Sequence, residues 1–203
     1  ALLKPNRRIR GIAAGDSFRR LVAKSLAKQK QNELRSAVWP LNFGLSDRSG
    51  TDTAVHFLQY LSDRYPTKVI LSIDGIGAFD SISRESMLQG LMKSPMGKRA
   101  LPFIRQFYGE ASQHLWTDAE GKVHTIDQAE GGEQGDPLMP ALFSLGQHPA
   151  LEQVARRLVD DEHVFAYLDD IYLICKPERV AELLNEVQDA LWRHARIQIH
   201  EGK

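Results

Sequence analysis

The sequence has few features of a membrane protein, a disulfide-linked protein or a strongly charged binding module. It contains one cysteine, Cys175, which excludes an internal disulfide and favours a reducing, intracellular compartment. No apolar run approaches the length of a membrane span, and no signal-peptide pattern opens the chain. The formal net charge is zero, so no global positive field indicates a nucleic-acid partner. No histidine pair has zinc-ligand spacing with cysteines, so we expect no zinc site.

The charge that is present is distributed unevenly. The first 35 residues are rich in Lys and Arg and contain only two acids, Asp16 and Glu33. The acids gather later in the chain, at Asp74, Asp80, Asp160, Asp161, Glu162, Asp169 and Asp170. This arrangement is expected where metal ions and phosphates meet between a basic and an acidic part, although ordinary helix surfaces also produce it.

Hydrophobic periodicity predicts an α+β fold with an antiparallel sheet covered on one face by helices. Helices are predicted at 17–39, 53–64, 84–93, 97–112, 137–161 and 177–195. Strands are predicted at 7–14, 68–74, 163–168, 171–175 and 196–200, with a further hairpin between 112 and 132. We expect that hairpin to turn at Glu120-Gly121, Ser83 to cap a helix, and the tryptophans to lie in the core or at interfaces.

The segment FAYLDDIYLICK, from Phe165 to Lys176, places two adjacent aspartates inside an apolar run. A buried carboxylate without a partner costs several kcal/mol, so it is normally paired, protonated or bound to a metal. A second strand-like run, KVILSID, ends at Asp74. If the two strands are neighbours, Asp74 and Asp169 meet at one edge of the sheet. Converging carboxylates suit a pair of Mg²⁺ ions, which prefer oxygen ligands, whereas isolated surface acids are the alternative.

A third segment, GGEQGDPLMPALFSL, places a glycine-rich turn directly before a helix. The small residues around Gln134 and Gly135 let the backbone approach a flat substrate such as a base and sugar. The alternative is an ordinary loop that leads into a proline-initiated helix. We expect Asp136 to cap that helix and Asp80 to form a local hydrogen bond, so both are interpreted as structural.

These segments, taken together, resemble the palm motifs of reverse transcriptases. DGIGAF from Asp74 resembles motif A, QGDPL from Gln134 resembles motif B, and YLDD from Tyr167 resembles motif C. Each motif is moderately specific, but all three in this order are very specific. RGI from Arg10 is similar to the fingers segment that begins Arg-Pro-Ile in the non-LTR retrotransposon branch. NFG from Asn42 resembles the next block of that branch.

The resemblance extends to the end of the chain, where IQIHEGK, from Ile197 to Lys203, is similar to motif D. The sequence departs from the family pattern at three positions. Gly11 stands where proline is usual, Leu168 where Ala, Met or Val is frequent, and His200 where asparagine is usual. None of these changes touches the aspartates, so the resemblance implies intact catalytic residues.

The resemblance implies roles for individual residues. Asp74 and Asp169 correspond to the catalytic metal ligands, Asp170 to their less essential neighbour, and the carbonyl of Gly75 to an additional ligand. The ions implied are two Mg²⁺, for which Mn²⁺ can substitute.

Five further residues are implied to contact the incoming nucleotide. Phe79 occupies the steric-gate position, where a bulky ring excludes a ribose 2′-hydroxyl; it also fits an ordinary core aromatic. Gln134 and Gly135 would line the nucleotide and template base, Arg10 would hold the triphosphate, and Lys203 would protonate the leaving pyrophosphate. Tyr167 and Leu168 are implied to support the aspartate turn.

By this resemblance the chain is a nucleotidyltransferase, an RNA-directed DNA polymerase that uses an RNA template, a DNA primer and dNTPs. We expect fingers at 1–67, palm at 68–94 and 131–203, and a fingers/palm insertion at 95–130. Both ends look cut from a longer protein, the thumb is missing, and the nucleus would suit a retrotransposon enzyme. Two alternatives stay open. One is an RNA-directed RNA polymerase, against which Phe79 and the YLDD motif argue, and the other is an inactive nucleic-acid-binding relic.

Overall fold

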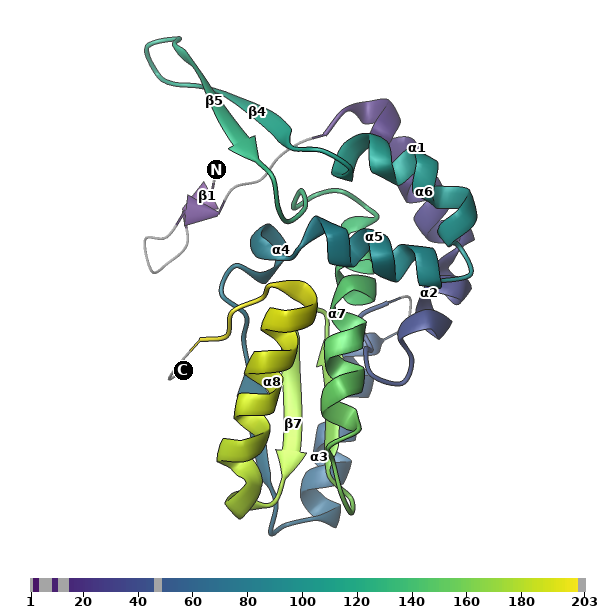
Figure 1. The fold of residues 1–203 in the computed structure, drawn as a ribbon, viewed down its shortest axis with the longest axis vertical. Helices are drawn as coiled ribbons and strands as arrows, with labels where there is room; N and C mark the ends of the chain where they lie inside the picture. Colours follow the sequence, from purple (N-terminus) through teal and green to yellow (C-terminus); the bar gives the residue numbers. More distant parts are fainter. Residues whose placement is uncertain (1, 4–8, 11–14, 46–48, 201–203) are drawn as a thin grey trace.

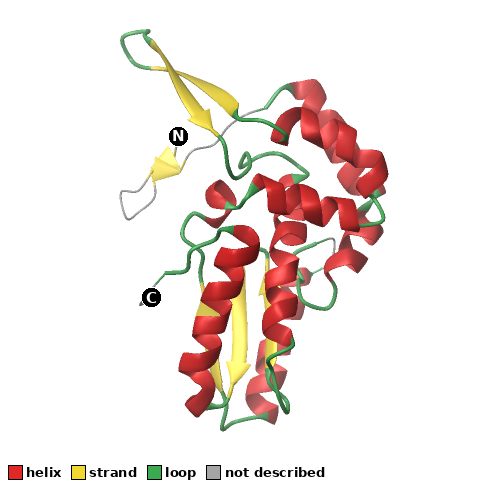
Figure 2. Cartoon of the chain, in the orientation of Figure 1, coloured by secondary structure: helices red, strands yellow, loops and turns green. Residues whose placement is uncertain are grey.

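The computed structural model of the chain describes residues 2–3, 9–10, 15–45 and 49–200. Figures 1 and 2 show two parts. A three-stranded sheet with its covering helices forms the lower part, and a layer of helices with a projecting two-stranded hairpin forms the upper part. No helix of the described ranges is both long and apolar enough to cross a membrane.

The central sheet is fully antiparallel and has the strand order β3-β7-β6. Its strands are β3 (Val69–Ile73), β6 (His163–Tyr167) and β7 (Asp170–Cys175). The predicted strands at 68–74, 163–168 and 171–175 are therefore confirmed to within one residue. Their dense apolar and β-branched content fits a sheet that is buried on one face and largely covered on the other.

Two long helices cover one face of this sheet, α7 (Met139–Ala155) and α8 (Val180–Ala195). The main hydrophobic core lies between these helices and the strand residues that alternate toward them, such as Ile171 and Leu173. α3 (Gly50–Arg64) packs on the opposite face, where a second core cluster forms around Phe165. Helices therefore contact both faces of the sheet, whereas the sequence predicted cover on one face only.

The upper layer contains α1 (Ser17–Gln29), α2 (Gln31–Val38), α5 (Arg84–Lys93), α6 (Gly97–Tyr108) and the hairpin of β4 (Ser112–Thr117) with β5 (Val123–Gln128). The single helix predicted from 17 to 39 is wrong, because the chain breaks at Lys30 into α1 and α2. The break lets α2 bury Leu34 and Val38 next to α7, while Ala23 is the buried residue of α1.

Shorter elements complete the described chain. They are β1 (Leu2–Leu3) paired with β2 (Ile9–Arg10), α4 (Ala78–Ser81) and a 3₁₀ turn at Pro177–Arg179 that leads into α8. The remainder of the strand predicted at 7–14 lies outside the described residues. The strand predicted at 196–200 is reduced to a single bridge between Ile199 and Gly75.

Two local predictions are confirmed, since the hydroxyl of Ser83 caps α5 and the β4–β5 hairpin turns at residues 118–122. Of the two placements expected for the tryptophans, the core placement is wrong and the interface placement stays a prediction. Trp39, Trp116 and Trp192 are each about half-exposed, at 47%, 53% and 46%.

Candidate active site

Strand register brings the predicted metal ligands to one end of the sheet, which we call the carboxylate edge (Asp74, Asp169 and Asp170). Ile73, the last residue of β3, pairs with Ile171 of β7. The next positions along the same register are Asp74 and Asp170, so these two residues stand opposite each other. Asp169 lies in the two-residue turn that joins β6 to β7. The chain thus places all three aspartates at the edge that the sequence predicted.

The alternation of side chains sends these acids away from the main core. Ile73 and Ile171 are buried at 5% and 2% exposure, so their neighbours Asp74 and Asp170 take the opposite face of the sheet. Asp74 and Asp169 are half-buried and Asp170 is exposed. The donor set, three carboxylates, fits the oxygen preference of Mg²⁺. In the described ranges, no three His, Cys, Asp or Glu side chains stand close enough together to hold one ion.

The segment around Asn42 holds the aspartate turn in place. Backbone hydrogen bonds join this segment to Ala166 of β6, with Phe43 N donating to Ala166 O and Ala166 N to Leu41 O. The buried amide oxygen of Asn42 accepts from the backbone N–H of Gly44 at 2.8 Å and of Leu168 at 3.5 Å. The resemblance marked this block without giving it this supporting role.

Leu168 has a φ of 57°, a left-handed conformation that is costly for a branched side chain. Its side chain presses against Gly44, where a Cβ would lie 2.7 Å from the Leu168 Cγ. Tyr167, the other supporting residue, ends β6 and packs against the second core cluster. Close packing around the turn therefore offsets the strain at Leu168.

Residues 198–200, near the C-terminal end of the described chain, hold the segment that follows Asp74. The carbonyl of Asp74 accepts a hydrogen bond from His200 N at 3.0 Å, and Ile76 N donates to Gln198 O at 2.7 Å. Gly75 lies between them, and a Cβ there would come within 2.8 Å of the Ala78 Cβ. The motif D segment thus contacts motif A, which its position in the sequence alone does not indicate.

Phe79 lies in α4, five positions after Asp74, and its ring stacks on Phe143 of α7. The two ring centroids are 4.3 Å apart and the planes are inclined by 8°. The ring is half-buried against the main core, so Phe79 fills the role of a core aromatic. The residue is only partly buried, so part of it stays accessible.

The glycine-rich segment before α7 lies directly against α4. Gly131 N donates to Ile82 O at 2.8 Å, and Gly132 N donates to Phe79 O at 3.0 Å. Gly131 has a φ of 65°, and a Cβ there would lie 2.2 Å from the Asp80 carbonyl oxygen, so only glycine fits.

The side chain of Gln134 continues this contact. Its Nε2 donates to the Asp80 carboxylate, at 3.1 Å to Oδ1 and 3.3 Å to Oδ2. The local hydrogen bond expected of Asp80 is therefore wrong, because its side chain binds the motif B glutamine, 54 positions along the chain. Gly135 follows in an exposed turn with a φ of 136°, a conformation that favours glycine.

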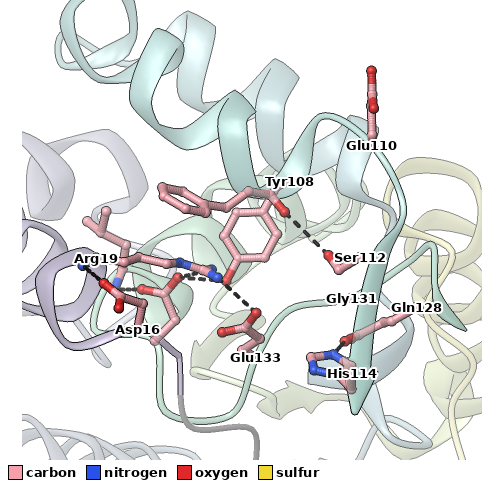
Figure 3. Close-up of polar contacts among 12 residues, drawn as sticks. Asp16, Arg19, Tyr108, Glu110, Ser112, His114, Gln128, Gly131 and Glu133 are labelled. Carbon is pink, nitrogen blue, oxygen red and sulfur yellow. Dashed lines mark hydrogen bonds and ion pairs between the residues drawn. The ribbon is translucent and has the colours of Figure 1, made fainter. Parts of the chain in front are cut away.

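A buried polar network adjoins this turn on its other side, and we call it the arginine network (Arg19, Arg84, Tyr108, Glu133 and Asp136). Arg19 Nη1 lies 2.9 Å from Glu133 Oε1, and its Nη2 lies 2.9 Å from Asp136 Oδ2. The Tyr108 hydroxyl donates to the same Asp136 oxygen at 2.8 Å. Figure 3 shows Arg19, Tyr108 and Glu133 pointing toward one another from separate segments.

Arg84 belongs to the network through Tyr108, since its guanidinium carbon lies 5.4 Å from the centroid of that ring. It is 5% exposed, and its guanidinium donates to the carbonyls of Gly131 and Glu110 and to the Ser112 hydroxyl. Its backbone N–H donates to the Glu130 carboxylate at 2.8 Å. The start of the β4–β5 hairpin and the glycine-rich segment are thereby joined through one side chain.

Burial and charge set the electrostatics of the network. Burial, followed by the charge and the hydrogen bond of Asp136, raises the pKa of Tyr108 far above its usual value of 10.0. Burial would by itself lower the pKa of Arg19, but interactions with Tyr108, Glu133 and Asp136 outweigh it and raise that pKa. Burial lowers the pKa of Arg84 below its usual 12.5. The phenol therefore stays neutral and acts as a hydrogen-bond donor at ordinary pH.

Leu138 is the N-cap of α7 and has no side-chain cap, so the capping role predicted for Asp136 is wrong; Asp136 instead closes the turn before the helix. Its Oδ1 accepts from Leu138 N at 2.9 Å, just before α7 begins at Met139. Its Oδ2 belongs to the arginine network. Sequence reasoning missed that network because Arg19 and its partners are separated by 114 and 117 positions. The one local signal was a pair of adjacent arginines at the start of a helix.

Two predicted site residues lie outside what the structure describes. The backbone of Arg10 belongs to β2, but its side chain is outside the described residues, and so is Lys203. The Gly11 and Ile12 positions of the same fingers motif are also outside them.

Three comparisons relate the chain to known proteins. Residues 3–203 match the family model described as reverse transcriptase (RNA-dependent DNA polymerase). The retrotransposable element SLACS 132 kDa protein of Trypanosoma brucei gambiense is 22% identical over 191 residues, which are 94% of this chain and 16% of that protein.

Among solved structures, a C-terminally truncated apo telomerase from Candida tropicalis superposes with a TM-score of 0.62 at 12% identity, over 92% of this chain and 42% of that one. Telomerase from Candida albicans in complex with a TWJ fragment of telomeric RNA gives a TM-score of 0.59 at 12% identity, over 89% and 33%. The chain therefore spans less than half the length of each of these proteins. The likeness confirms the predicted α+β fold.

Proposed function

Because the chain belongs to the reverse transcriptase (RNA-dependent DNA polymerase) family, we propose that it carries the nucleotidyl-transfer site of an RNA-directed DNA polymerase. The observation that carries the proposal is the β3–β7 register, which sets Asp74 opposite Asp170 at the edge where the Asp169 turn also lies. A phosphoryl-transfer site needs oxygen ligands at one point beside a surface for the nucleotide. The carboxylate edge would be that point.

In this proposal, Asp74 and Asp169 hold the catalytic metal ions, with Asp170 and the Gly75 carbonyl as additional ligands. When bound, two Mg²⁺ ions (or Mn²⁺) supply activation of the primer 3′-hydroxyl and neutralisation of the charge on pyrophosphate. The aspartates would hold the ions at the end of the sheet. The turn that carries Asp169 is braced by a hydrogen bond to Asn42.

The nucleotide would lie beside α4 and the motif B turn. Phe79 would exclude a ribose 2′-hydroxyl with the exposed part of its ring, while its stack on Phe143 keeps that ring from moving aside. Gln134 and Gly135 would line the base and sugar. Arg10 and Lys203 are proposed for the triphosphate and the leaving pyrophosphate, on the strength of the motif match alone.

The division of the chain follows from the same proposal. Residues 1–67 would form fingers, residues 68–94 and 131–203 the palm, and residues 95–130 an insertion between them. The palm ranges contain the whole central sheet with α7 and α8, and the insertion contains α6 and the β4–β5 hairpin. An RNA template, a DNA primer and dNTPs are the proposed partners. The retrotransposable-element relative supports placing the chain in a mobile element.

The test is extension of a DNA primer on an RNA template with Mg²⁺, comparing dNTPs with NTPs. It should use the longest natural polypeptide that contains this sequence. Wild type is expected to incorporate dNTPs, and Asp169→Ala to abolish synthesis while primer–template binding persists in a filter assay. Asp63→Ala, a matched change of an exposed aspartate in α3, should leave synthesis intact.

Each other outcome overturns part of the proposal. Preferential incorporation of NTPs would assign the chain to RNA-directed RNA synthesis and remove the gate role from Phe79. Binding of primer–template without any synthesis by wild type would identify an inactive relic. Equal activity of wild type and Asp169→Ala would remove the carboxylate edge from the chemistry.

A further inference from the structure

Arg19 joins two carboxylates that stand on either side of the motif B turn. Its Nη1 lies 2.9 Å from Glu133 Oε1 and its Nη2 lies 2.9 Å from Asp136 Oδ2. Gln134 and Gly135 are the two residues between these carboxylates. One planar guanidinium therefore spans the turn and fixes both of its flanks, which a point charge cannot do.

The surroundings of Arg19 make this clamp rigid. The exposed fraction of its side chain is 11%, against 10% for Glu133 and 5% for Asp136. The guanidinium carbon lies 4.2 Å from the centroid of the Phe107 ring and 5.3 Å from that of Tyr108. Charges this well buried have to remain paired, because an unpaired one would pay its full desolvation cost. Any displacement of the turn that separated them would therefore be unfavourable.

The turn itself has little to hold it in one conformation. A backbone hydrogen bond from Asp136 N to Glu133 O, 3.1 Å long, closes it. The Gly135 backbone has a φ of 136°, and glycine is the residue with the largest freedom to leave such a conformation. On the α4 side, the Gln134 side chain is held by Asp80. On the opposite side, Arg19 supplies the restraint.

We propose that Arg19 is a positioning residue of the nucleotide site, which holds Gln134 and Gly135 in register with α4 by clamping Glu133 and Asp136. This inference rests on the proposed function, because it assigns the turn to the incoming nucleotide. Arg19 acts through the two carboxylates, so its loss should weaken nucleotide binding more than the chemical step. It also couples α1, in the N-terminal part of the chain, to the geometry of the site.

The experiment compares Arg19→Gln with Arg20→Gln, a matched control one position away whose side chain is exposed. Hydrogen–deuterium exchange of the backbone at 131–138 measures whether the turn has been released. Steady-state extension measures KM for dNTP and kcat separately. We expect faster exchange in this segment. We also expect KM to rise roughly tenfold while kcat changes by less than about threefold. The rise stays below the loss of about a hundredfold in rate that a larger misplacement of a binding group can cause.

Two further variants separate positioning from simple loss of stability. Arg19→Lys keeps the charge but reaches one carboxylate at a time, so its KM should fall between those of wild type and Arg19→Gln. The double variant Arg19→Gln/Glu133→Gln should be no worse in KM than Arg19→Gln alone, because both changes open the same clamp. If the rise in KM of the double variant equals the product of the rises caused by Arg19→Gln and by Glu133→Gln separately, the proposal is overturned.

The outcomes for this inference differ from those for the proposed function. Unchanged exchange at 131–138 in Arg19→Gln overturns the positioning role whether or not the protein synthesises DNA. Faster exchange throughout the chain, or a loss of kcat with KM unchanged, likewise overturns it. If wild type makes no DNA but exchange rises locally, the clamp stands as a restraint on the turn and its assignment to a nucleotide site is wrong.

Discussion

Backbone pairing places the aspartates of the carboxylate edge, whereas side-chain contacts place the members of the arginine network. Asp74 and Asp170 stand opposite each other because β3 and β7 pair over five residues before reaching them. Arg19 meets Asp136 only because α1, α6 and the segment before α7 pack together. The first arrangement follows from the strand register, with the Asn42 amide bracing the turn, while the second depends on the side chain of each of its members. The two regions should therefore respond to mutation in opposite ways.

The largest expected effect is on activity at the carboxylate edge. Asp74→Asn should lower the rate of nucleotide incorporation by roughly 10³-fold or more, because a neutral amide is a poor ligand for the metal ions that carry the chemistry. The free energy of unfolding should change by no more than about 0.5 kcal/mol, since the residue is outside the core and its backbone pairing is kept. Single-nucleotide extension and urea unfolding on the same sample measure both quantities.

Asp170→Asn provides the internal comparison for this prediction. Asp170 is exposed and is proposed as the less essential ligand, so its loss of rate should be clearly smaller. An equal loss in both variants would show that Asp170 is as essential as Asp74. Unfolding of Asp74→Asn would show that the edge is held by its side chains after all.

Arg84→Gln should produce the largest loss of stability. Arg84 is 5% exposed and donates to two backbone carbonyls and one hydroxyl, and the shorter neutral side chain would leave these acceptors without partners. We expect the free energy of unfolding to fall by about 3 kcal/mol. Arg105→Gln, an exposed arginine on α6, should change it by less than about 0.5 kcal/mol. Similar values for the two variants would contradict the idea that the network depends on its individual members.

The same contrast explains how far the sequence could predict the molecule. The aspartate turn and the end of β3 are local patterns, namely apolar runs that end on acids, and periodicity reads such patterns well. The β4–β5 turn and the Ser83 cap are local in the same sense. No Gly or Pro marks the break at Lys30. It accompanies the packing of α2 against α7, which local sequence patterns do not show.

The arginine network could not be predicted, for a different physical reason. Nothing near Arg19 in the sequence distinguishes it from Arg20, yet one is buried against two carboxylates and the other is exposed. The difference arises from which face of α1 meets α6, and that depends on contacts across more than a hundred residues. Ordinary single-sequence patterns carry no such information.

Phe79 packs against the main core and is also proposed to contact the nucleotide. A substitution there should therefore lower both the stability of the protein and its discrimination between nucleotides, each to a moderate degree. Phe79→Val removes the stack on Phe143, so we expect a loss of about 2 kcal/mol in the free energy of unfolding. It also shortens the proposed gate, so discrimination against NTPs should fall by roughly tenfold. Competition between dNTPs and NTPs in the extension assay measures the second effect.

Phe143→Leu is the control for the gate. It removes the same ring stack by changing Phe143 instead of Phe79. Phe143 is 0% exposed, so it cannot reach the nucleotide. Discrimination should therefore stay near that of wild type. If both variants lose discrimination equally, the effect comes from the core and Phe79 does not act as a gate.

The smallest expected effect is at Tyr108, where the change removes one hydrogen bond and keeps the ring. Tyr108→Phe loses the 2.8 Å bond to Asp136 but retains the aromatic surface beneath Arg19. At pH 7 the free energy of unfolding should fall by about 1 kcal/mol. Urea unfolding measures it, with Tyr60→Phe as the matched change of an exposed tyrosine.

The difference in free energy of unfolding between wild type and Tyr108→Phe should depend on pH, and that dependence tests whether the Tyr108 phenol is held neutral. Burial raises the pKa of Tyr108 in the folded protein above 10.0, so the folded state keeps its phenol proton where the unfolded chain releases it. The stabilisation is therefore fully present below pH 10 and is lost as the pH rises above 10, by up to about 1.4 kcal/mol per pH unit. Tyr108→Phe has no such proton to release, so its deficit should shrink above pH 10. A deficit that stays constant from pH 7 to pH 11 would show that Tyr108 is not held neutral by the network.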